Sequence, residues 1–202
     1  MQRQKQKAES RKWNPNFNLQ VFPRITTIPI ATEHGVFMAH YSTRGLAALE
    51  FPSVQRQSQA PVATAASVPV QVRHWHAVTN RALHQALEGR TPGKLPPLDL
   101  SSGTVFQRRV WHALRQIAAG KTRSYGDVAR SIGKPEAVRA VGGACGANPI
   151  PIFVPCHRVL AANHRLGGFS GGLDWKRKLL AQEGVRFEVG QPDQMLAPAP
   201  AR

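Results

Sequence analysis

Residues 148–155, with the sequence NPIPIFVP, constrain the fold more than any other stretch of the chain. Proline fixes its own φ angle and disfavours helix at the residue before it. Pro149, Pro151 and Pro155 therefore exclude a helix here and predict a rigid, extended, apolar segment. Because the segment ends at Cys156, the sequence predicts that this thiol is held by a stiff support.

Cys156 is followed directly by His157 and Arg158. Two basic neighbours favour the thiolate form of a cysteine, which is the form that attacks electrophiles. The alternative is a buried cysteine that acts as a small apolar side chain, and the residues alone leave both interpretations open. The chain has one other cysteine, Cys145. Two cysteines are too few for a disulfide framework or a four-cysteine zinc site, and they fit a reducing compartment.

A glutamate further along the chain is a candidate partner for His157. The glycine-rich loop 166–172 is followed by a predicted helix that ends at Glu183 and Gly184. A carboxylate in the last turn of a helix lies at the unfavourable end of the helix dipole. Pairing with a cation explains that position better than isolation does, which leads to the hypothesis of a Cys–His–Glu relay. A solvated Glu183 is the alternative.

Two short helices are predicted between residues 124 and 146. Ser124 is positioned to cap the first helix, Gly133 stops it, and Pro135 suits the first turn of the second. A pair of short helices around a glycine-containing turn is a candidate DNA-binding helix-turn-helix. Any two packed helices give the same pattern, so this signal does not decide the function.

Gly142 and Gly143 lie inside the second of these helices. Glycine in a helix interior costs about 1 kcal/mol relative to alanine, so another interaction is expected to offset the cost. Close approach of a backbone, a base or a phosphate would do so, and tight packing between two helices is the alternative.

The remaining patterns predict an α/β fold. Residues 36–41 and 46–51 flank a glycine-containing turn and predict a β-hairpin. Residues 72–88 have a helical apolar face, and a capping box at Thr104 predicts a helix that extends to Ile117. The predicted organisation is a basic flexible tail (1–24), an N-terminal sheet-and-helix domain (25–98) with a loop insertion (52–70), a mainly helical C-terminal domain (99–188) and a flexible C-terminal tail (189–202).

Charge indicates the class of partner. The formal net charge is +16, with +9 between residues 101 and 188 and +5 in residues 1–24. Such an excess favours nucleic acid or an anionic surface, although a basic protein without a polyanionic partner is the alternative. No apolar run approaches the roughly 18 residues of a membrane helix. The basic N-terminus is not followed by an apolar stretch, so a cytoplasmic protein without a secretory signal is expected.

The segment 155–159 (PCHRV), preceded by 148–151 (NPIP), resembles the active-site signature of the 6-O-alkylguanine-DNA alkyltransferases, also called methylated-DNA–protein-cysteine methyltransferases. The resemblance covers essentially all of 101–188. Further matching blocks are Thr104–Gln107, Ser124–Asp127, Arg139–Ala144, the glycine loop and Lys176–Gly184. Residues 25–89 resemble, more loosely, the N-terminal domain of that family, which has a ribonuclease-H-like topology.

The resemblance implies DNA repair without a cofactor by a monomer. The helix-turn-helix would bind double-stranded DNA in the minor groove, and the alkylated guanine would be flipped into a pocket. Cys156 would accept the alkyl group of 6-O-alkylguanine, and of 4-O-alkylthymine, as a stable thioether, so each molecule would act once.

The resemblance also implies residue roles. His157 would act on Cys156 through a water, Glu183 would orient His157, and Asn148 would brace the active-site turn. Tyr125 would crowd the phosphate and donate to the guanine ring.

Other implied roles concern DNA and the pocket. Arg139 would enter the base stack and fill the space that the flipped base leaves. The remaining implied contacts are the helix residues Gly142, Gly143 and Ala144 for DNA, Ser170 with the backbone of Cys156 and Val159 for the guanine edge, and Phe169 for the alkyl group. Phe169 replaces a tyrosine that many members carry, which alters the expected tolerance for bulky groups.

Two further features of the chain bear on its resemblance to the family. Cys145 falls where other members often carry Met, Cys or a similar apolar residue, so it is interpreted as a packing residue. The zinc-binding cysteines of some members are missing, so no metal site is expected from the histidines His34, His40, His74, His76 and His84.

Two other functions stay open. A DNA-binding protein that recognises lesions or regulates without transfer is the main alternative, and the presence of Cys156 argues against it. A cysteine hydrolase with a Cys–His–Glu site is the other, and the sequence has no evident oxyanion-hole signature.

Overall fold

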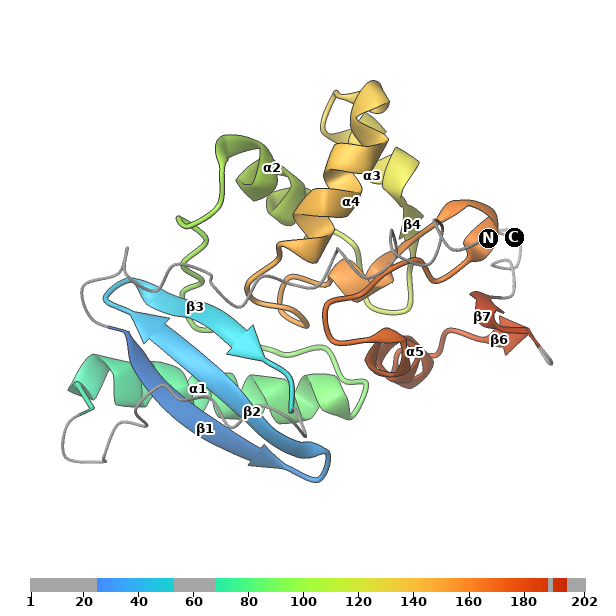
Figure 1. Cartoon of the computed structure of the whole chain (residues 1–202). Coiled ribbons are helices and arrows are strands. Elements are labelled where there is room, and N and C mark those ends of the chain that lie inside the picture. The colour runs from blue at the N-terminus through green and yellow to red at the C-terminus, as the bar shows by residue number, and fades with distance from the viewer. Residues whose placement is uncertain (1–24, 53–67, 189–190, 196–202) are drawn as a thin grey trace, which may run out of the picture.

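The computed structural model describes residues 25–52, 68–188 and 191–195. The predicted tail 1–24 and most of the predicted insertion 52–70 lie outside these residues. The fold is α/β, with a small sheet and one helix in the N-terminal half and helices around short strands in the C-terminal half (Figure 1). None of the helices in the described part of the chain is long and apolar enough to cross a membrane.

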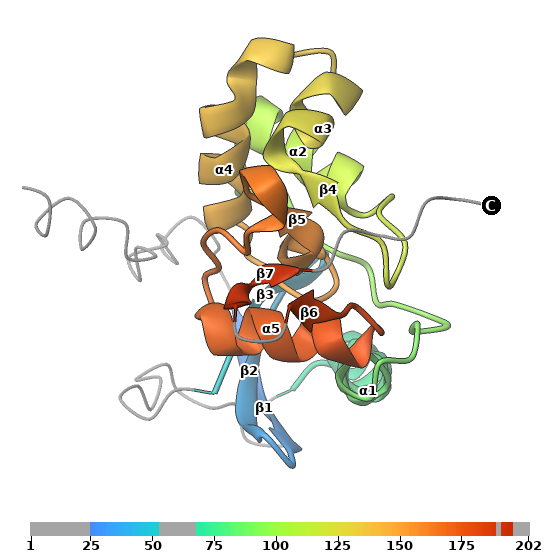
Figure 2. The ribbon, with the colours of Figure 1, turned by 90° about the vertical axis from the view of Figure 1, so that its right-hand side faces the viewer.

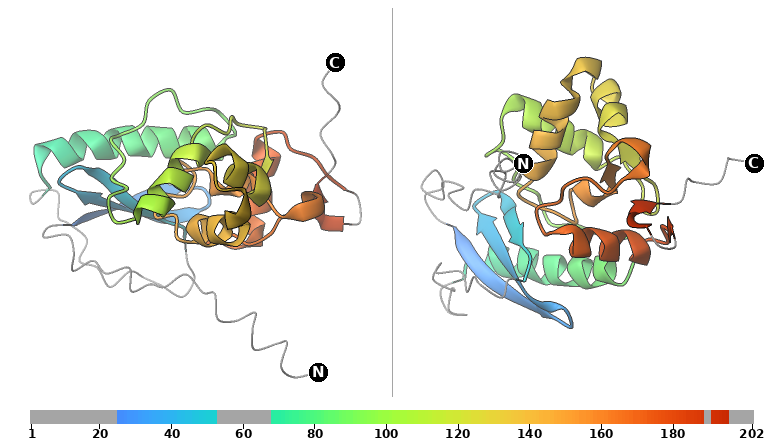
Figure 3. Two further views of the ribbon diagram at one scale, coloured as in Figure 1. Left: turned by 90° about the horizontal axis from the view of Figure 1, so that it is seen from above. Right: turned by 45° about the vertical axis from the view of Figure 1, so that its right-hand side comes forward.

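The N-terminal half is a three-stranded antiparallel sheet with one helix against it. The elements are β1 (Thr26–Thr32), β2 (Gly35–Ser42), β3 (Gly45–Glu50) and α1 (Val70–Leu87). The sheet has the order β1-β2-β3, and α1 packs along it (Figures 1 and 3). The predicted hairpin is confirmed as β2 and β3, with Ser42 paired to Gly45 across the turn.

Strand β3 ties the two halves together. The backbone N–H of Leu46 donates to the Pro97 carbonyl at 2.9 Å, and the N–H of Asp99 donates to Leu46 at 2.7 Å. Gly45 has a φ of +146°, and a side chain on it would collide with the Pro97 carbonyl. The two halves also share one hydrophobic core, which runs from the sheet through the C-terminal helices.

The C-terminal half begins with three helices that follow the predicted signals closely. These are α2 (Val105–Leu114), α3 (Tyr125–Ser131) and α4 (Val138–Gly146). Capping boxes are present at Thr104 and at Ser124. Helices α3 and α4 form the end of the molecule away from the sheet (Figure 2).

Two boundaries differ from the prediction. Helix α2 ends at Leu114 rather than Ile117, because the following backbone groups form tighter bonds to carbonyls three residues back. Pro135 does not begin α4. It begins a separate 3-10 turn, Pro135–Ala137, that precedes α4.

The segment 148–155 is not helical, as predicted, but the prediction that it is extended was wrong. It folds into turns in which the Val154 N–H donates to the Ile150 carbonyl at 2.9 Å, and Ile152 has a left-handed φ of +76°. The Asn148 side chain forms hydrogen bonds with the Ile150 N–H and the Val154 carbonyl of this segment. The positions of the prolines alone did not predict these bonds.

The chain continues through a 3-10 turn at Cys156 to a last helix and a small hairpin. These elements are η4 (Cys156–Arg158), β5 (Val159–Leu160), η5 (Ala162–His164), α5 (Leu173–Gln182), β6 (Phe187–Glu188) and β7 (Gln191–Met195). Strand β7 lies within the predicted flexible tail 189–202. It pairs antiparallel with β6, so that part of the prediction was wrong.

Candidate active site

Cys156 lies where several segments meet. The two-residue strands β4 (Arg123–Ser124) and β5 pair in parallel, with Arg123 opposite Val159. This pairing sets the start of α3, and therefore Tyr125, beside the residues that follow Cys156. Helix α5 packs against the turn that carries Cys156 (Figure 2). Residues distant in sequence are thus assembled around one thiol.

Asn148 organises the segment that leads to Cys156. Its Oδ1 accepts the Ile150 N–H at 3.1 Å, and its Nδ2 donates to the Val154 carbonyl at 2.7 Å and to the Cys156 Sγ at 3.1 Å. Asn148 is almost fully buried, so these bonds are shielded from water. A buried side chain with three such bonds fixes both the turn and the thiol.

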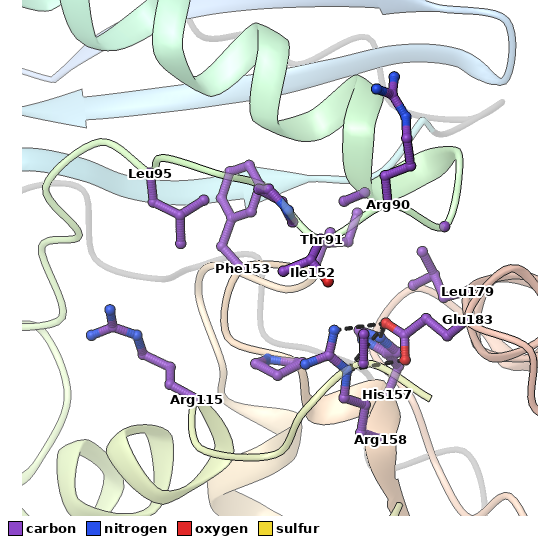
Figure 4. A pocket seen from close by; sticks show the side chains of 15 residues that line it. Arg90, Thr91, Leu95, Arg115, Ile152, Phe153, His157, Arg158, Leu179 and Glu183 are labelled. Atoms are coloured by element: carbon purple, nitrogen blue, oxygen red, sulfur yellow. Dashed lines mark hydrogen bonds and ion pairs between the residues drawn. The ribbon is translucent and has the colours of Figure 1, made fainter. Parts of the chain in front are cut away.

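His157 and Glu183 form the pair that the sequence suggested. The His157 Nε2 lies 3.0 Å from the Glu183 Oε1. Arg158 also binds this carboxylate, with its Nε 3.0 Å from Oε2 and its Nη2 2.7 Å from Oε1. The Gly120 N–H donates to the same carboxylate at 3.1 Å. Figure 4 shows Arg158 and His157 converging on Glu183.

The protonation of this pair follows from its surroundings. Burial alone would raise the pKa of Glu183, but the hydrogen bonds and charges of His157 and Arg158 lower it to about 2. Burial lowers the pKa of His157, against the opposing effect of Glu183. We therefore assign a neutral imidazole that donates from Nε2 to Glu183. Its Nδ1 has no hydrogen-bond partner among the described residues, so it presents a free lone pair.

The thiol differs from the sequence-based interpretation. Burial raises the pKa of Cys156, while the bond from Asn148 and the charge of Lys176 lower it. Arg158 does not provide the expected field at the sulfur, because its guanidinium is turned to Glu183 and to the Ile117 carbonyl, 2.5 Å away. The resting group is a thiol that needs a base. The prediction that both basic neighbours favour thiolate was wrong, because Arg158 is turned to Glu183 and the neutral His157 adds no positive charge.

Lys176 is a site residue that the sequence reasoning did not identify. It is 0% exposed, and its Nζ donates to the carbonyls of Val159, at 2.6 Å, and Leu166. Burial lowers the pKa of Lys176 to about 8. The available sequence signal was that Lys176 lies among leucines on a predicted helix. That pattern predicts an apolar helix face and does not predict a buried lysine. The lysine ties β5 to the start of the glycine loop and adds positive charge beside the thiol.

Tyr125 stands between α4 and the glycine loop. A side-chain atom added at Gly142 would lie 4.0 Å from its ring, and one added at Gly167 would lie 3.2 Å from its hydroxyl. Burial raises the pKa of Tyr125 to about 12. Its phenol is therefore a hydrogen-bond donor at neutral pH.

The helix α4 residues divide into buried and open positions. Ala144 and Cys145 are buried, whereas Arg139 is exposed near the start of the helix. A side-chain atom added at Gly143 would meet nothing within 4 Å. Tight helix packing therefore does not explain Gly143, and it faces open space.

Phe169 and Ser170 occupy the glycine loop. The Phe169 ring lies 6.3 Å from the His157 ring, edge to face, while Ser170 is exposed. The Val159 backbone, a predicted guanine reader, already has partners, because its carbonyl accepts from Lys176 and its N–H donates to the Cys156 carbonyl. The structure thus gathers most of the predicted residues around Cys156 and leaves Arg139 and Ser170 on the surface.

A pocket of about 190 Å³ lies on the side of the His157–Glu183 pair, under the segment that follows α1 (Figure 4). His157, Glu183 and Ile152 contribute to its wall, together with Arg90 and Arg115. Cys156, Tyr125 and the glycine loop do not line it. This pocket is therefore not the space in which a group would meet the thiol.

Glu183→Gln is expected to lower the free energy of unfolding at pH 7 by about 3 kcal/mol. Between about pH 4.5 and pH 2 the Glu183 carboxylate of the folded protein stays ionised. In the unfolded chain its pKa is 4.5, so there it takes up a proton over the same range. This contribution is complete above about pH 4.5 and is lost as the pH falls towards 2. Denaturant titrations of both proteins at pH 7, 5 and 3 measure it, and the difference should shrink at pH 3.

Asp174→Asn is the matched control for this prediction. Asp174 lies on the same helix and pairs with Arg177 at 2.7 Å, but its side chain is 99% exposed. Exposed pairs contribute little, so this variant should be close to wild type at every pH. A loss in Glu183→Gln that stays constant between pH 7 and 3 would contradict the charge assignment.

Comparison with known proteins identifies relatives of this chain. Residues 105–185 match the family described as 6-O-methylguanine DNA methyltransferase, DNA binding domain. The methylated-DNA–protein-cysteine methyltransferase of Methanosarcina acetivorans is 49% identical over 107 residues, which are 52% of this chain and 69% of that protein. The protein of the same name from Mycolicibacterium paratuberculosis is 55% identical over 94 residues, 45% of this chain and 57% of its own length. Part of each relative therefore lies outside the alignment.

Solved structures resemble the chain over a longer span. Mycobacterium tuberculosis OGT in complex with DNA superposes with a TM-score of 0.65 and 36% identity, covering 78% of this chain and 92% of that one. The O6-methylguanine-DNA methyltransferase of Pyrococcus kodakaraensis has a TM-score of 0.56 and 25% identity, covering 80% of this chain and 100% of that one. The likeness extends across both the sheet and the helical half.

Proposed function

The chain belongs to the methylated-DNA–protein-cysteine methyltransferase family, and we propose that it repairs duplex DNA by transferring the alkyl group of 6-O-alkylguanine to Cys156. One observation carries the proposal. The buried Cys156 thiol accepts a hydrogen bond from Asn148 and is followed directly by the imidazole that Glu183 holds. The names of the relatives support the same chemistry.

The transfer requires that the thiol lose a proton at the moment of attack. We assign this proton to the free Nδ1 of His157, directly or through one water. The nearby Lys176 charge and the Asn148 donor stabilise the thiolate against its burial. Glu183, which stays ionised, then stabilises the imidazolium that forms.

The bond changes balance within the protein and the base. The Cys156 sulfur forms a bond to the alkyl carbon, and the bond between that carbon and the guanine oxygen breaks with its electron pair remaining on the base. The base takes up one proton from the Tyr125 hydroxyl, which is still protonated at neutral pH. The proton that His157 took from Cys156 is released and Tyr125 regains one from solvent, so the net change is transfer of the thiol proton to the base. A thioether has no leaving group comparable to guanine, so the protein acts once.

Helices α3 and α4 are proposed as the helix-turn-helix that binds the DNA. They pack against each other at the end of the molecule (Figure 2), and the open face of Gly143 admits a backbone or a base. Arg139 is exposed on the same helix, where it is available to fill the space of a flipped base. The net charge of +9 in residues 101–188 suits phosphate contacts.

Gly143→Ala is expected to raise stability by about 1 kcal/mol and to weaken DNA binding. Alanine favours helix, and its methyl group meets no protein atom within 4 Å, but the methyl group would occupy space assigned to DNA. Thermal unfolding and fluorescence anisotropy with a duplex oligonucleotide measure the two effects.

Gly146→Ala serves as the control, because Gly146 ends the same helix and is equally open. It should change DNA affinity less than Gly143→Ala does. Undiminished affinity in a stabilised Gly143→Ala protein would contradict the assignment of Gly143 to the DNA surface.

Four finer assignments complete the proposal. The N-terminal half, a three-stranded antiparallel sheet against one helix, is proposed to be ribonuclease-H-like. The substrates include 4-O-alkylthymine, since the same attack on an O-alkyl carbon applies to it. A monomer suffices, because Cys156, His157 and Glu183 all come from one chain. The cytoplasm suits the two free thiols.

Transfer of a labelled methyl group tests the proposal. The protein is incubated with duplex DNA that contains 6-O-[methyl-³H]methylguanine, and label is measured on protein, on DNA and as released methanol. Label on the protein is expected. Label released as methanol would indicate a hydrolase, and label that stays on DNA to which the protein binds would indicate a lesion-recognition protein; either result would overturn the proposal.

A further inference from the structure

An aromatic cluster links the N-terminal sheet to the glycine loop. We propose that Phe51, directly after β3, is a positioning residue that sets the place of Phe169 and thereby the size of alkyl group that fits beside Cys156. This inference rests on the proposed function and adds a specificity determinant from the half of the chain that carries no candidate catalytic residue.

Phe51 contacts the loop at two points. Its ring lies 5.5 Å from the Phe169 ring, edge to face at 71°. A side-chain atom added at Gly171 would lie only 2.7 Å from the Phe51 ring, so the loop backbone passes directly over that ring. Phe169 in turn meets His157 at 6.3 Å between ring centroids. A displacement of Phe51 is therefore transmitted to His157 through a single intervening side chain, Phe169.

Phe51 is itself held from behind. Its ring lies 4.9 Å from the Trp175 ring and 5.5 Å from the Phe37 ring. Phe37 is fully buried in the sheet, and Trp175 lies on α5. Close-packed rings resist displacement, so the sheet and α5 together provide a rigid support for Phe51.

The same end of β3 reaches the other wall of the site. The Leu49 N–H donates to the Pro149 carbonyl at 2.9 Å, one residue after Asn148. Leu49 and Phe51 thus connect the end of β3 both to the turn that holds the thiol and to the loop that carries Phe169. The strand fixes the separation of these two segments.

The glycine loop depends on such external support. Lys176 holds its start through the Leu166 carbonyl, and Gly172 closes its end by donating to the Phe169 carbonyl at 3.1 Å. Gly168 and Gly172 have open space around them. Between these anchors Phe51 supplies contact to both Phe169 and Gly171, so the size of residue 51 controls how far Phe169 can recede.

Phe51→Leu is expected to favour large alkyl groups. Removing part of the ring leaves space behind Phe169, which the loop can use when a bulky group enters. Second-order transfer rates are measured with two duplexes of identical sequence that contain 6-O-methylguanine or 6-O-benzylguanine. The benzyl-to-methyl rate ratio should rise about tenfold, the scale at which pockets discriminate by size.

Phe37→Leu is the matched control. It removes the same atoms from the same cluster, and Phe37 contacts Phe51 and Trp175 but has no ring contact with Phe169. Its rate ratio should rise less than that of Phe51→Leu, because the space it leaves lies behind Phe51 and not directly behind Phe169. Phe51→Met, which keeps more of the volume, is measured in parallel so that a folded variant is available.

An unchanged ratio in a folded residue-51 variant would overturn the role of Phe51, as would an equal rise in Phe37→Leu. A wild-type protein that transfers neither group would overturn the proposed function, and the inference with it. The two failures are distinguishable because the wild-type rate is measured in the same experiment.

Discussion

Replacing Cys156 with alanine is expected to abolish alkyl transfer completely, whereas Cys145→Ala should retain it. The Cys156 sulfur is the atom that forms the new bond, and no neighbouring group can substitute for a polarisable nucleophile. Cys145 is also buried, but its pKa is raised by burial without a hydrogen-bond donor to offset it. Protein-bound label from methylated duplex DNA measures both variants.

The pair of substitutions separates chemistry from packing. Both remove one buried sulfur, so both should cost similar stability, and melting temperatures check that each variant folds. DNA binding by Cys156→Ala should persist, because α3 and α4 are unchanged. Residual transfer in folded Cys156→Ala, or loss of transfer in folded Cys145→Ala, would contradict the assignment.

Arg139→Ala is expected to slow repair of duplex DNA by about 100-fold while changing the reaction with free 6-O-benzylguanine little. Extruding a base costs a few kcal/mol of stacking and pairing, and a side chain that fills the gap offsets part of that cost. Free base needs no extrusion. Single-turnover rates with each substrate give the comparison.

Arg73→Ala controls for loss of charge. Arg73 is exposed on α1, in the half of the chain away from α4, so its removal tests general attraction to DNA alone. It should slow duplex repair only slightly. Equal slowing of duplex and free-base reactions by Arg139→Ala would exclude a role in base extrusion.

Local signals predicted helices well in this chain. Thr104 forms the capping box that its spacing predicts, and Ser124 caps α3 as predicted, because a cap is satisfied within four residues and needs no tertiary partner. The position of Glu183 at the end of a helix predicted a cationic partner, and His157 does bind it. The cation on this carboxylate is Arg158, however, which the sequence argument did not name as its partner.

Features that depend on distant carbonyls were not predictable. Lys176 appears in the sequence as a polar residue on a helix, and its burial depends on the Val159 and Leu166 carbonyls that the fold brings to it. The turns of residues 148–155 likewise depend on the Asn148 side chain rather than on proline geometry. Local φ preferences excluded helix there but could not choose between an extended and a folded segment.

The contact of Phe51 with the glycine loop belongs to the same class. A phenylalanine at the end of a hairpin indicates core packing, and nothing in its neighbourhood indicates residues 169 and 171. The sheet was predicted as a separate unit, whereas one core and several backbone bonds join it to the site. The influence of one half on the other is a tertiary property.

Stoichiometry tests the central claim most directly. The protein is mixed with an excess of duplex DNA containing 6-O-methylguanine, and intact-mass and peptide mass spectrometry follow the adduct until it stops growing. We expect a plateau of one methyl group per molecule, located on the peptide that contains Cys156, with no further repair afterwards. Continued repair beyond one equivalent, or a methyl group on any other residue, would contradict the account.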